Sequence, residues 1–173
     1  MFGMLKPIKI KANVVDFEGH ARVSRLLEIE GATNPTPYSP NKLRSLLRRC
    51  CYCCWVLETK DIIDRKYRKP YIIGWALCEV DKRYRKINIL RFAIDPEFSE
   101  EGFETQLMLN LINDTFFEKV FINMRESDLN GHLFLKELEF KAFKVLRNFF
   151  KNPTEDAYCF VFRRKSIIEQ SAT

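Results

Sequence analysis

The sequence predicts an α/β (α+β) protein built on one central mixed, mostly antiparallel sheet of about seven strands with about four flanking helices. Apolar runs rich in β-branched and aromatic residues alternate with charged connections, as strands and turns do. Other segments place apolar residues at helical spacing. One strand-like run leads into a helix and then into another strand-like run, which predicts a parallel pair within the sheet.

The first half of the chain predicts a strand, two helices and three antiparallel strands. Residues 8–10 alternate as in an edge strand, and residues 16–30 carry apolar residues at nearly helical spacing. Ser39 followed by Pro40 is a typical helix start and predicts a basic helix over residues 41–49. The three antiparallel strands are expected at residues 51–57, 71–80 and 87–94.

The second half predicts a helix, a strand, a helix and two strands. Residues 103–112 carry a helical apolar stripe, so that residues 87–94 and 120–124 are expected to be parallel neighbours on either side of it. The remaining helix and two strands are expected at residues 129–138, 143–150 and 157–163. We expect a single domain over residues 1–165 and a flexible tail at 166–173.

Composition favours a folded protein with a positive charge. The 173 residues are 46% hydrophobic with six Gly, which argues against disorder. Lys and Arg outnumber Asp and Glu by 29 to 23, and the net charge of +6 would favour a polyanion such as a ribosome or an acidic protein. Because the basic residues are scattered, a role in solubility is the simpler interpretation. Since no leader-like or membrane-spanning run occurs, we expect a cytoplasmic protein.

Four cysteines in the segment 50–54, CCYCC, produce two overlapping CxxC spacings. This spacing is typical of zinc sites. No second ligand pair follows, and His20 and His132 lie far away in the sequence. We therefore favour a buried strand in which Cys acts as a small apolar residue, and we expect no metal.

The join between residues 87–94 and 103–112 has an architecture that often binds phosphate. The first N–H groups of a helix have no partner within the helix, and the helix dipole adds positive charge there. Five acidic side chains crowd this join, namely Asp95, Glu97, Glu100, Glu101 and Glu104. Ser99 as N-cap, with acid in the first turn, would also make a good helix start without any ligand. Both interpretations stay open.

Three stretches follow one another along the chain: FAIDPEF at 92–98, MRESDLNGHLFLKELEFKAFKVLRNFF at 124–150 and EDAYCFVFR at 155–163. Together with the order of elements, they resemble the GCN5-related N-acetyltransferase (GNAT) superfamily over nearly the whole chain. The RimI-like ribosomal-protein alanine N-acetyltransferases are the most similar members. The resemblance implies the GNAT fold, with a splayed parallel pair, and transfer of acetyl from acetyl-CoA to a protein N-terminal amine.

The resemblance also implies where acetyl-CoA binds. Pantetheine would lie along the strand ending at residue 94, and the pyrophosphate would rest on N–H groups of residues 100–105. The implied cofactor-binding residues are Phe92, Ala93, Ile94, Glu100, Glu101, Gly102, Phe103, Glu104, Thr105 and Asp128. The phosphate loop of the family, R/Q-x-x-G-x-G/A, falls on Ser99, Gly102 and Glu104, so only its first glycine is kept.

Catalytic residues are implied in the same way. Glu126 and Glu155 are the candidate bases for the acceptor ammonium, and Tyr158 is the phenol nearest to the leaving thiolate. The tyrosines that serve as acid in the family are replaced here. The replacing residues are Leu135, Phe149 and Phe150.

Two other functions stay open. A catalytically degenerate GNAT-fold protein that serves as a peptide- or protein-binding module is favoured by the replaced motifs. Nucleic-acid contact through residues 41–49, 66–69 and 81–86 would use interleaved Arg and Tyr, but a solvated basic edge explains them more simply. The expected partner is a protein or peptide N-terminus, a ribosomal protein among the candidates, with no membrane; a monomer or a dimer is expected.

Overall fold

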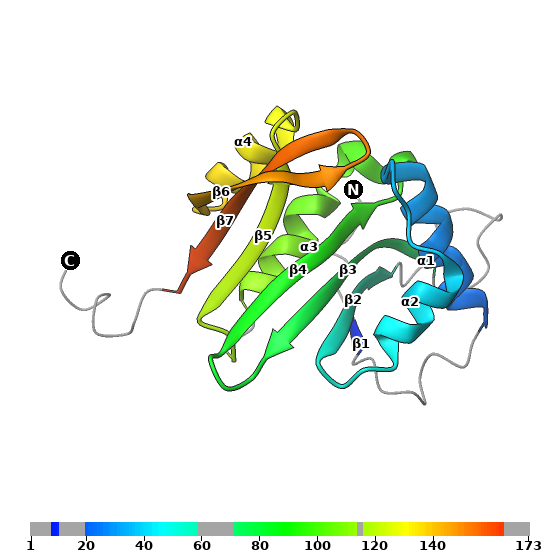
Figure 1. The fold of residues 1–173 in the computed structure, drawn as a ribbon. Helices are drawn as coiled ribbons and strands as arrows, with labels where there is room; N and C mark the ends of the chain where they lie inside the picture. Colours follow the sequence, from blue (N-terminus) through cyan, green and yellow to red (C-terminus); the bar gives the residue numbers. More distant parts are fainter. Residues whose placement is uncertain (1–7, 11–19, 59–70, 114–115, 165–173) are drawn as a thin grey trace. The chain divides into compact units, whose positions relative to one another are not determined.

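Strands and helices follow one another in the order that the sequence predicts in the computed structural model of the chain (Figure 1). The structure describes residues 8–10, 20–58, 71–113 and 116–164. The strands are β1 (Ile8–Ile10), β2 (Tyr52–Glu58), β3 (Ile72–Asp81), β4 (Lys86–Ile94), β5 (Lys119–Arg125), β6 (Lys141–Lys151) and β7 (Thr154–Arg163). The helices are α1 (His20–Thr33), α2 (Pro40–Leu47), the 3-10 helix η1 (Pro96–Glu101), α3 (Phe103–Ile112) and α4 (Leu129–Glu137).

The sheet is mixed and mostly antiparallel, which confirms the predicted fold class. Its strand order is β1-β2-β3-β4-β5-β7-β6. The pairs β1–β2, β2–β3, β5–β7 and β6–β7 are antiparallel, and β4–β5 is parallel. The predicted parallel neighbours are thus confirmed, because a helix crossover connects them as the sequence pattern requires.

The chain divides into two compact units. The first comprises Met1–Val80 and Leu90–Leu111, and the second comprises Asp81–Ile89 and Ile112–Thr173. Strand β4 contributes its first part to the second unit and its end to the first unit. The predicted single domain stays a prediction, and the predicted tail and the loop at 66–69 lie outside the described residues.

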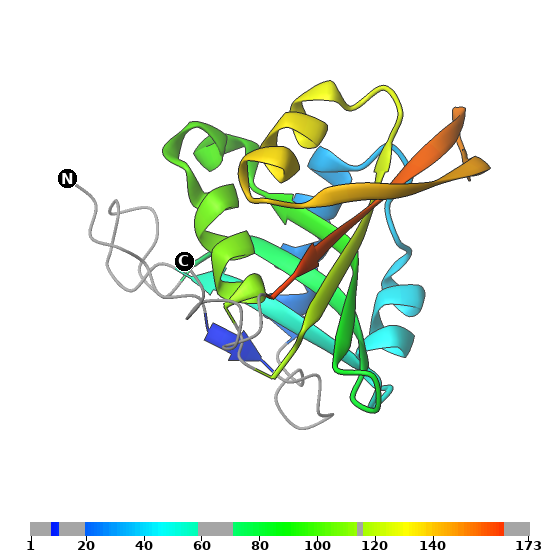
Figure 2. The same ribbon diagram turned by 90° about the vertical axis from the view of Figure 1, so that its left-hand side faces the viewer.

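In the first unit, α1 and α2 pack on one face of β2, β3 and the end of β4, while α3 lies on the other side of these strands (Figure 2). Apolar residues of α1 and α2 recur at helical spacing and form one buried cluster with the strands. Its members include Val23, Leu26, Ile29, Leu43, Leu46, Leu47, Val56, Trp75, Leu77 and Ala93.

Two local predictions in this unit are confirmed. The Ser39 hydroxyl oxygen accepts a 3.2 Å hydrogen bond from the Lys42 N–H, so it caps α2 as expected from the Ser-Pro start. Cys53 and Cys54 are buried in β2, and burial raises the pKa of the Cys54 thiol. The expectation of no metal stays a prediction; the described residues contain no group of three His, Cys, Asp or Glu side chains placed to hold a metal ion.

In the second unit, β5, β7 and β6 form an antiparallel sheet with α4 packed on one side (Figures 1 and 2). The rings of Tyr158 and Phe160 on β7 both contact the ring of His132 on α4. The parallel pairing joins Lys86–Ile89 to Lys119–Ile122. Of the described helices, none is long and apolar enough to cross a membrane.

Candidate functional site

The connection from β4 to α3 contains two helices rather than one. Asp95 caps η1, because its carboxylate accepts a 3.0 Å hydrogen bond from the Glu97 N–H, and Pro96 fixes φ at the first position. Gly102 ends η1 with a φ of +74°, a conformation that glycine adopts at little cost. Phe103 then begins α3.

Of the two interpretations left open for this join, the one that makes Ser99 the N-cap of the helix is wrong. Ser99 lies inside η1, where its hydroxyl donates a 3.1 Å hydrogen bond to the Pro96 carbonyl. Residues 100–101 therefore end η1, and the first turn of α3 contains one acidic residue, Glu104. The physical reason is that Asp95 and the proline after it supply a cap acceptor and a fixed φ earlier in the chain.

One of the five acidic residues at this join is neutralised within the first unit. Asp95 is 6% exposed, and its carboxylate pairs with the Arg25 guanidinium of α1. The Nε of Arg25 also donates a 3.1 Å hydrogen bond to the Ile72 carbonyl of β3. This ion pair joins α1 to the end of β4. Because the Arg25 charge neutralises that of Asp95, Asp95 adds no net negative charge at the start of α3.

Glu104 stands where the resemblance places a small residue of the phosphate loop. Its side chain is half-buried. This burial raises the pKa of the Glu104 carboxyl, and a hydrogen bond from its own backbone N–H acts in the opposite direction. The Glu104 carboxylate therefore lies against an amide of the first turn of α3, in the region where a bound phosphate would sit.

Most of the other predicted cofactor residues lie in the end of β4 or at the start of α3. Ala93, Ile94 and Phe103 are buried, so their side chains belong to the core and only their backbone could face a ligand. Phe92 is half-buried, while Gly102 and Thr105 are exposed. The join thus offers a strand end and the first-turn N–H groups of α3, of which that of Glu104 already bonds to its own carboxylate. A strand end and a helix start are backbone elements that can bind an anion.

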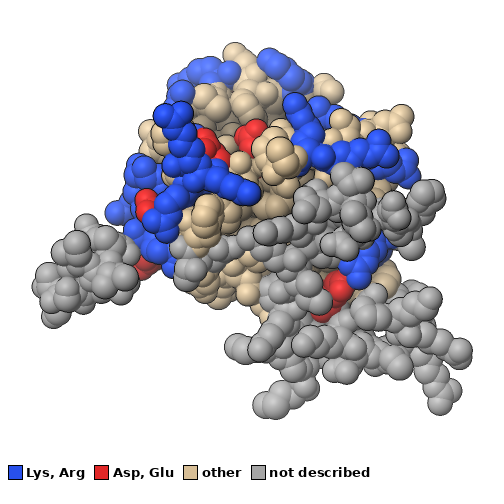
Figure 3. Space-filling model, turned by 90° about the horizontal axis from the view of Figure 1, so that it is seen from below, with Lys and Arg blue, Asp and Glu red and all other residues tan. Residues whose placement is uncertain are grey.

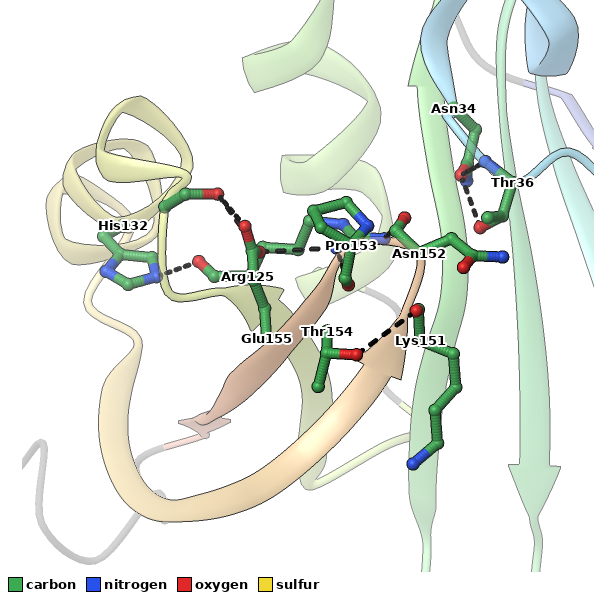
Figure 4. A network of polar contacts seen from close by, with 10 residues as sticks. Asn34, Thr36, Arg125, His132, Lys151, Asn152, Pro153, Thr154 and Glu155 are labelled. Atoms are coloured by element: carbon green, nitrogen blue, oxygen red, sulfur yellow. Dashed lines mark hydrogen bonds and ion pairs between the residues drawn. The ribbon is translucent and has the colours of Figure 1, made fainter.

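In the second unit, the side chain of Arg125 at the end of β5 contacts the turn between β6 and β7 and stabilises it (Figure 4). Its guanidinium donates hydrogen bonds to the carbonyls of Asn152 at 3.0 Å and Pro153 at 3.3 Å, and to the Glu155 carboxylate at 3.3 Å. The guanidinium carbon lies 4.3 Å from the Phe150 ring centroid. Four contacts from one planar group therefore hold this turn.

Glu155, a predicted base, belongs to this network. The Ser127 hydroxyl, in the turn after β5, lies 2.9 Å and 3.1 Å from its two carboxylate oxygens. With the Arg125 ion pair, both oxygens of Glu155 have polar partners. Glu155 is thus placed to hold the β5 end and the β6–β7 turn together.

Glu126, the other predicted base, has an exposed side chain. Its N–H donates a 3.2 Å hydrogen bond to the Asp156 carbonyl of β7. The Asp156 carboxylate accepts a 2.8 Å hydrogen bond from the Asn148 N–H and pairs with Arg147, and these contacts lower the pKa of Asp156. The pKa of Arg147 is raised, chiefly by Asp156 and to a lesser extent by Glu126.

Tyr158, the predicted phenol, packs against His132, which sequence reasoning did not select. The two ring centroids are 5.2 Å apart. The His132 Nε2 lies 2.9 Å from the Arg125 carbonyl oxygen, and because a carbonyl only accepts, Nε2 carries the proton in this contact. His132 lies within the stretch 124–150, but its place beside Tyr158 depends on the packing of α4 on β7, which no local pattern predicts.

Two positions that carry functional side chains in the GNAT pattern have structural roles here. Leu135 is fully buried in the core. Asp128 caps α4, since its carboxylate accepts a 2.8 Å hydrogen bond from the Gly131 N–H. A role for Asp128 in cofactor binding stays a prediction.

A basic turn between β3 and β4 belongs, together with residues 41–49, to the described part of the nucleic-acid hypothesis. Tyr84 is 59% exposed, with Arg83 and Lys86 over its ring at 5.4 Å and 5.3 Å. Lys86 pairs with Asp81 at 3.4 Å. The face in Figure 3 shows Lys and Arg side chains in separate groups, with acidic and uncharged surface between them. This distribution agrees with a solvated basic edge.

Comparison with known proteins identifies the fold. No protein-family model and no curated protein matches the sequence. The ribosomal-protein-S18-alanine N-acetyltransferase of Escherichia coli matches with a TM-score of 0.72 and 16% identity, over 92% of this chain and 94% of that chain. Arabidopsis thaliana NAA60 in complex with acetyl-CoA matches with a TM-score of 0.74 and 13% identity, over 93% and 100%. Spermidine N-acetyltransferase SpeG of Vibrio cholerae matches with a TM-score of 0.72 and 14% identity, over 96% and 99%. At these identities the likeness shows a shared fold.

Proposed function

We propose that this chain, which has the fold of the GCN5-related N-acetyltransferases, transfers an acetyl group from acetyl-CoA to the N-terminal amine of a protein. The observation that carries the proposal is the strand end and helix start formed by β4, η1 and α3. Support comes from the fold shared with two N-acetyltransferases and with NAA60, which is bound to acetyl-CoA. The RimI-like order of the sequence stretches supports a protein N-terminus as acceptor.

The helix start fits the pyrophosphate of acetyl-CoA through its backbone. Apart from Gly102 and its two chain neighbours, no atom of the described residues lies within 4 Å of the position where a side chain on Gly102 would begin, so a ligand can approach the backbone there. The first-turn N–H groups of α3 follow directly and can donate to phosphate oxygens. The negative charge of Glu104 opposes this binding. The binding proposal therefore requires that the backbone hydrogen bonds to phosphate stabilise the complex more than repulsion by this half-buried carboxylate destabilises it.

Glu126 is the better of the two candidate bases. Glu155 is tied to Arg125 and Ser127, whereas the exposed carboxylate of Glu126 is open to an incoming ammonium group. We assign Glu126 to accept the proton of the acceptor ammonium, after which the amine nitrogen bonds to the thioester carbonyl carbon and the carbon–sulfur bond breaks. The Tyr158 phenol is assigned to protonate the departing thiolate, and the second proton that the nitrogen loses as the amide forms restores the phenol.

The acceptor class rests on the sequence stretches, because the fold serves more than one acceptor. One matching structure is a ribosomal-protein alanine N-acetyltransferase and another is a spermidine N-acetyltransferase. An alanine-terminated peptide and spermidine are therefore the two acceptors to compare. We expect the peptide to be the better substrate.

A transfer assay tests the proposal. The full chain is incubated with acetyl-CoA and an alanine-terminated peptide, and mass spectrometry locates any added acetyl group. The same peptide with its N-terminus already acetylated is the control. We expect one acetyl group on the free N-terminus and none on the control; absence of product despite acetyl-CoA binding would contradict the proposed reaction.

A degenerate binding module is the second candidate function. The buried Leu135 and the phenyl rings of Phe149 and Phe150 favour it, because none of them can donate a proton to a thiolate. In that case the alanine-terminated peptide would bind, as measured by fluorescence anisotropy, but no acetylated product would form.

A further inference from the structure

Strand β6 forms one edge of the sheet, and β7 is its sole neighbour in the strand order of the described residues. Nine of its eleven residues are exposed and the other two are half-buried. An edge strand that is not covered presents a row of unpaired backbone N–H and C=O groups to solvent. The outer edge of β6 can therefore pair with an added strand on either side of the irregularity between Leu146 and Phe150, where Asn148 has a φ of +51° and donates its N–H to the Asp156 carboxylate.

Apolar side chains accompany this backbone edge. Phe143, Val145 and Phe149 are 54%, 38% and 47% exposed. Phe143 keeps this exposure even though its ring lies 5.8 Å from the ring of Phe121 on β5. An added strand turns every second side chain toward the same face. Exposed aromatic and branched side chains on β6 can contact these side chains and so make binding specific for certain sequences.

Charge on β6 has one sign. Residues 141–153 contain four basic side chains and no Asp or Glu, the basic residues being Lys141, Lys144, Arg147 and Lys151. Of these four, Arg147 alone has a carboxylate partner among the described residues, Asp156 of β7. The Lys151 Nζ donates a 2.9 Å hydrogen bond to the Asn148 carbonyl. None of the three lysines is neutralised by a carboxylate of the described residues, so their charges can interact with charges from outside this chain.

This charge pattern selects the occupant of the edge. If the β6 strands of two copies paired with each other, no register would bring a cation opposite a carboxylate, since the strand has no carboxylate to offer, and several registers would bring cation opposite cation. Lysines on an edge strand oppose such self-pairing. An extended segment rich in Asp or Glu has the complementary charge and gains from each lysine that it meets.

We propose that the outer edge of β6 binds an acidic, extended segment of a partner protein as an added strand. The backbone of β6 supplies the hydrogen bonds, Lys141, Lys144 and Lys151 select acidic side chains, and the exposed apolar side chains contact the residues between them. This docking is separate from the proposed acetyl transfer, because it involves neither Glu126 nor the helix start at Gly102.

A peptide-binding experiment on the full chain tests the proposal. The probe is a fluorescein-labelled octapeptide of alternating Glu and Val, acetylated at its N-terminus so that it cannot act as an acetyl acceptor. Its affinity is measured by fluorescence anisotropy for the natural protein, for the double variant Lys141→Glu/Lys144→Glu and for the matched control Lys82→Glu/Arg83→Glu. The control makes the same charge change on the exposed β3–β4 turn.

The proposal predicts binding of the acidic probe, about a tenfold or greater loss in the β6 variant, and little change in the control. Hydrogen exchange should slow at β6 amides when the probe is added, because they gain partners. The milder variant Lys141→Gln/Lys144→Gln should lose affinity in the same direction if the double Glu variant fails to fold. Equal losses in the β6 and turn variants, equal binding of a Lys-Val probe, or no binding at millimolar probe would overturn the proposal.

Discussion

The guanidinium of Arg125 lies over the ring of Phe150, with 4.3 Å between its central carbon and the ring centroid, and the same group holds the β6–β7 turn. The Arg125 side chain is 18% exposed, so these contacts are largely shielded from water. Cation–π contacts and hydrogen bonds from a charged donor gain strength under such shielding. Arg125 is therefore the residue on which the geometry of the turn depends most.

Replacing Arg125 by lysine should loosen the β6–β7 turn while keeping the charge. Lysine lacks the planar fork that reaches two carbonyls and a carboxylate at once, so we expect a loss of about 1–2 kcal/mol in unfolding free energy. Hydrogen exchange at Thr154 and Glu155 should quicken. The control is Arg163→Lys at the exposed end of β7; equal effects of the two substitutions would contradict the assigned role.

The two carboxylate partners of Arg25 should differ sharply in their effect on stability. Asp95 is buried against Arg25, whereas Glu28 meets the same guanidinium at 3.0 Å with a side chain that is 65% exposed. Asp95→Asn should cost about 3–5 kcal/mol, because it leaves a shielded charge without its partner. Glu28→Gln should cost at most about 1 kcal/mol. Urea unfolding measures the loss of unfolding free energy in both variants. Comparable losses would show that the buried Asp95 pair stabilises the protein no more than the exposed Glu28 pair.

Glu104 should make the stability of the protein depend on pH. Burial raises the pKa of this carboxyl above its ordinary value of 4.5, so the folded state favours the protonated form. The resulting stabilisation is present below the ordinary value and is lost as pH rises through the raised value. Glu104→Gln should therefore raise the melting temperature relative to the natural protein near pH 7 and leave it similar at about pH 4. A gain of equal size at both pH values would mean that the charge is not the cause.

Substitutions of Glu126 and Glu155 should have different effects, the first on the rate of acetyl transfer and the second on the stability of the β6–β7 turn. Glu126→Gln should lower the rate of acetyl transfer by about two to four orders of magnitude and leave the melting temperature nearly unchanged. Glu155→Gln should lower the melting temperature, because the Arg125 ion pair is lost, with a smaller effect on rate. Rates are measured by thiol release. The reverse pattern would move the role of base from Glu126 to Glu155.

Local patterns in the sequence predict most of the fold. Alternation and helical spacing locate the strands and helices, and the Ser39 cap follows from two adjacent residues. The Ser99 prediction fails because several cap signals lie close together, and the choice among them depends on Asp95, whose carboxylate is buried beside Arg25. Local sequence patterns do not show which candidate residue caps the helix when tertiary contacts decide between the candidates.

The candidate site is less predictable because its contacts join distant residues. Arg125 meets Glu155 thirty positions away, and Arg25 meets Asp95 seventy positions away. Strand register and helix packing bring such pairs together, and neither can be predicted from the local patterns of one sequence. The same holds for His132, which reaches Tyr158 only because α4 packs on β7.

A calorimetric titration of the full chain with acetyl-CoA tests the central claim most directly, because every proposed step needs acetyl-CoA at the helix start. We predict saturable binding, tightened about tenfold by Glu104→Ala through removal of a nearby negative charge, and unchanged by Glu137→Ala on the exposed surface of α4. Absence of heat and of any thermal shift at millimolar acetyl-CoA, in both the natural protein and the Glu104 variant, would contradict the account.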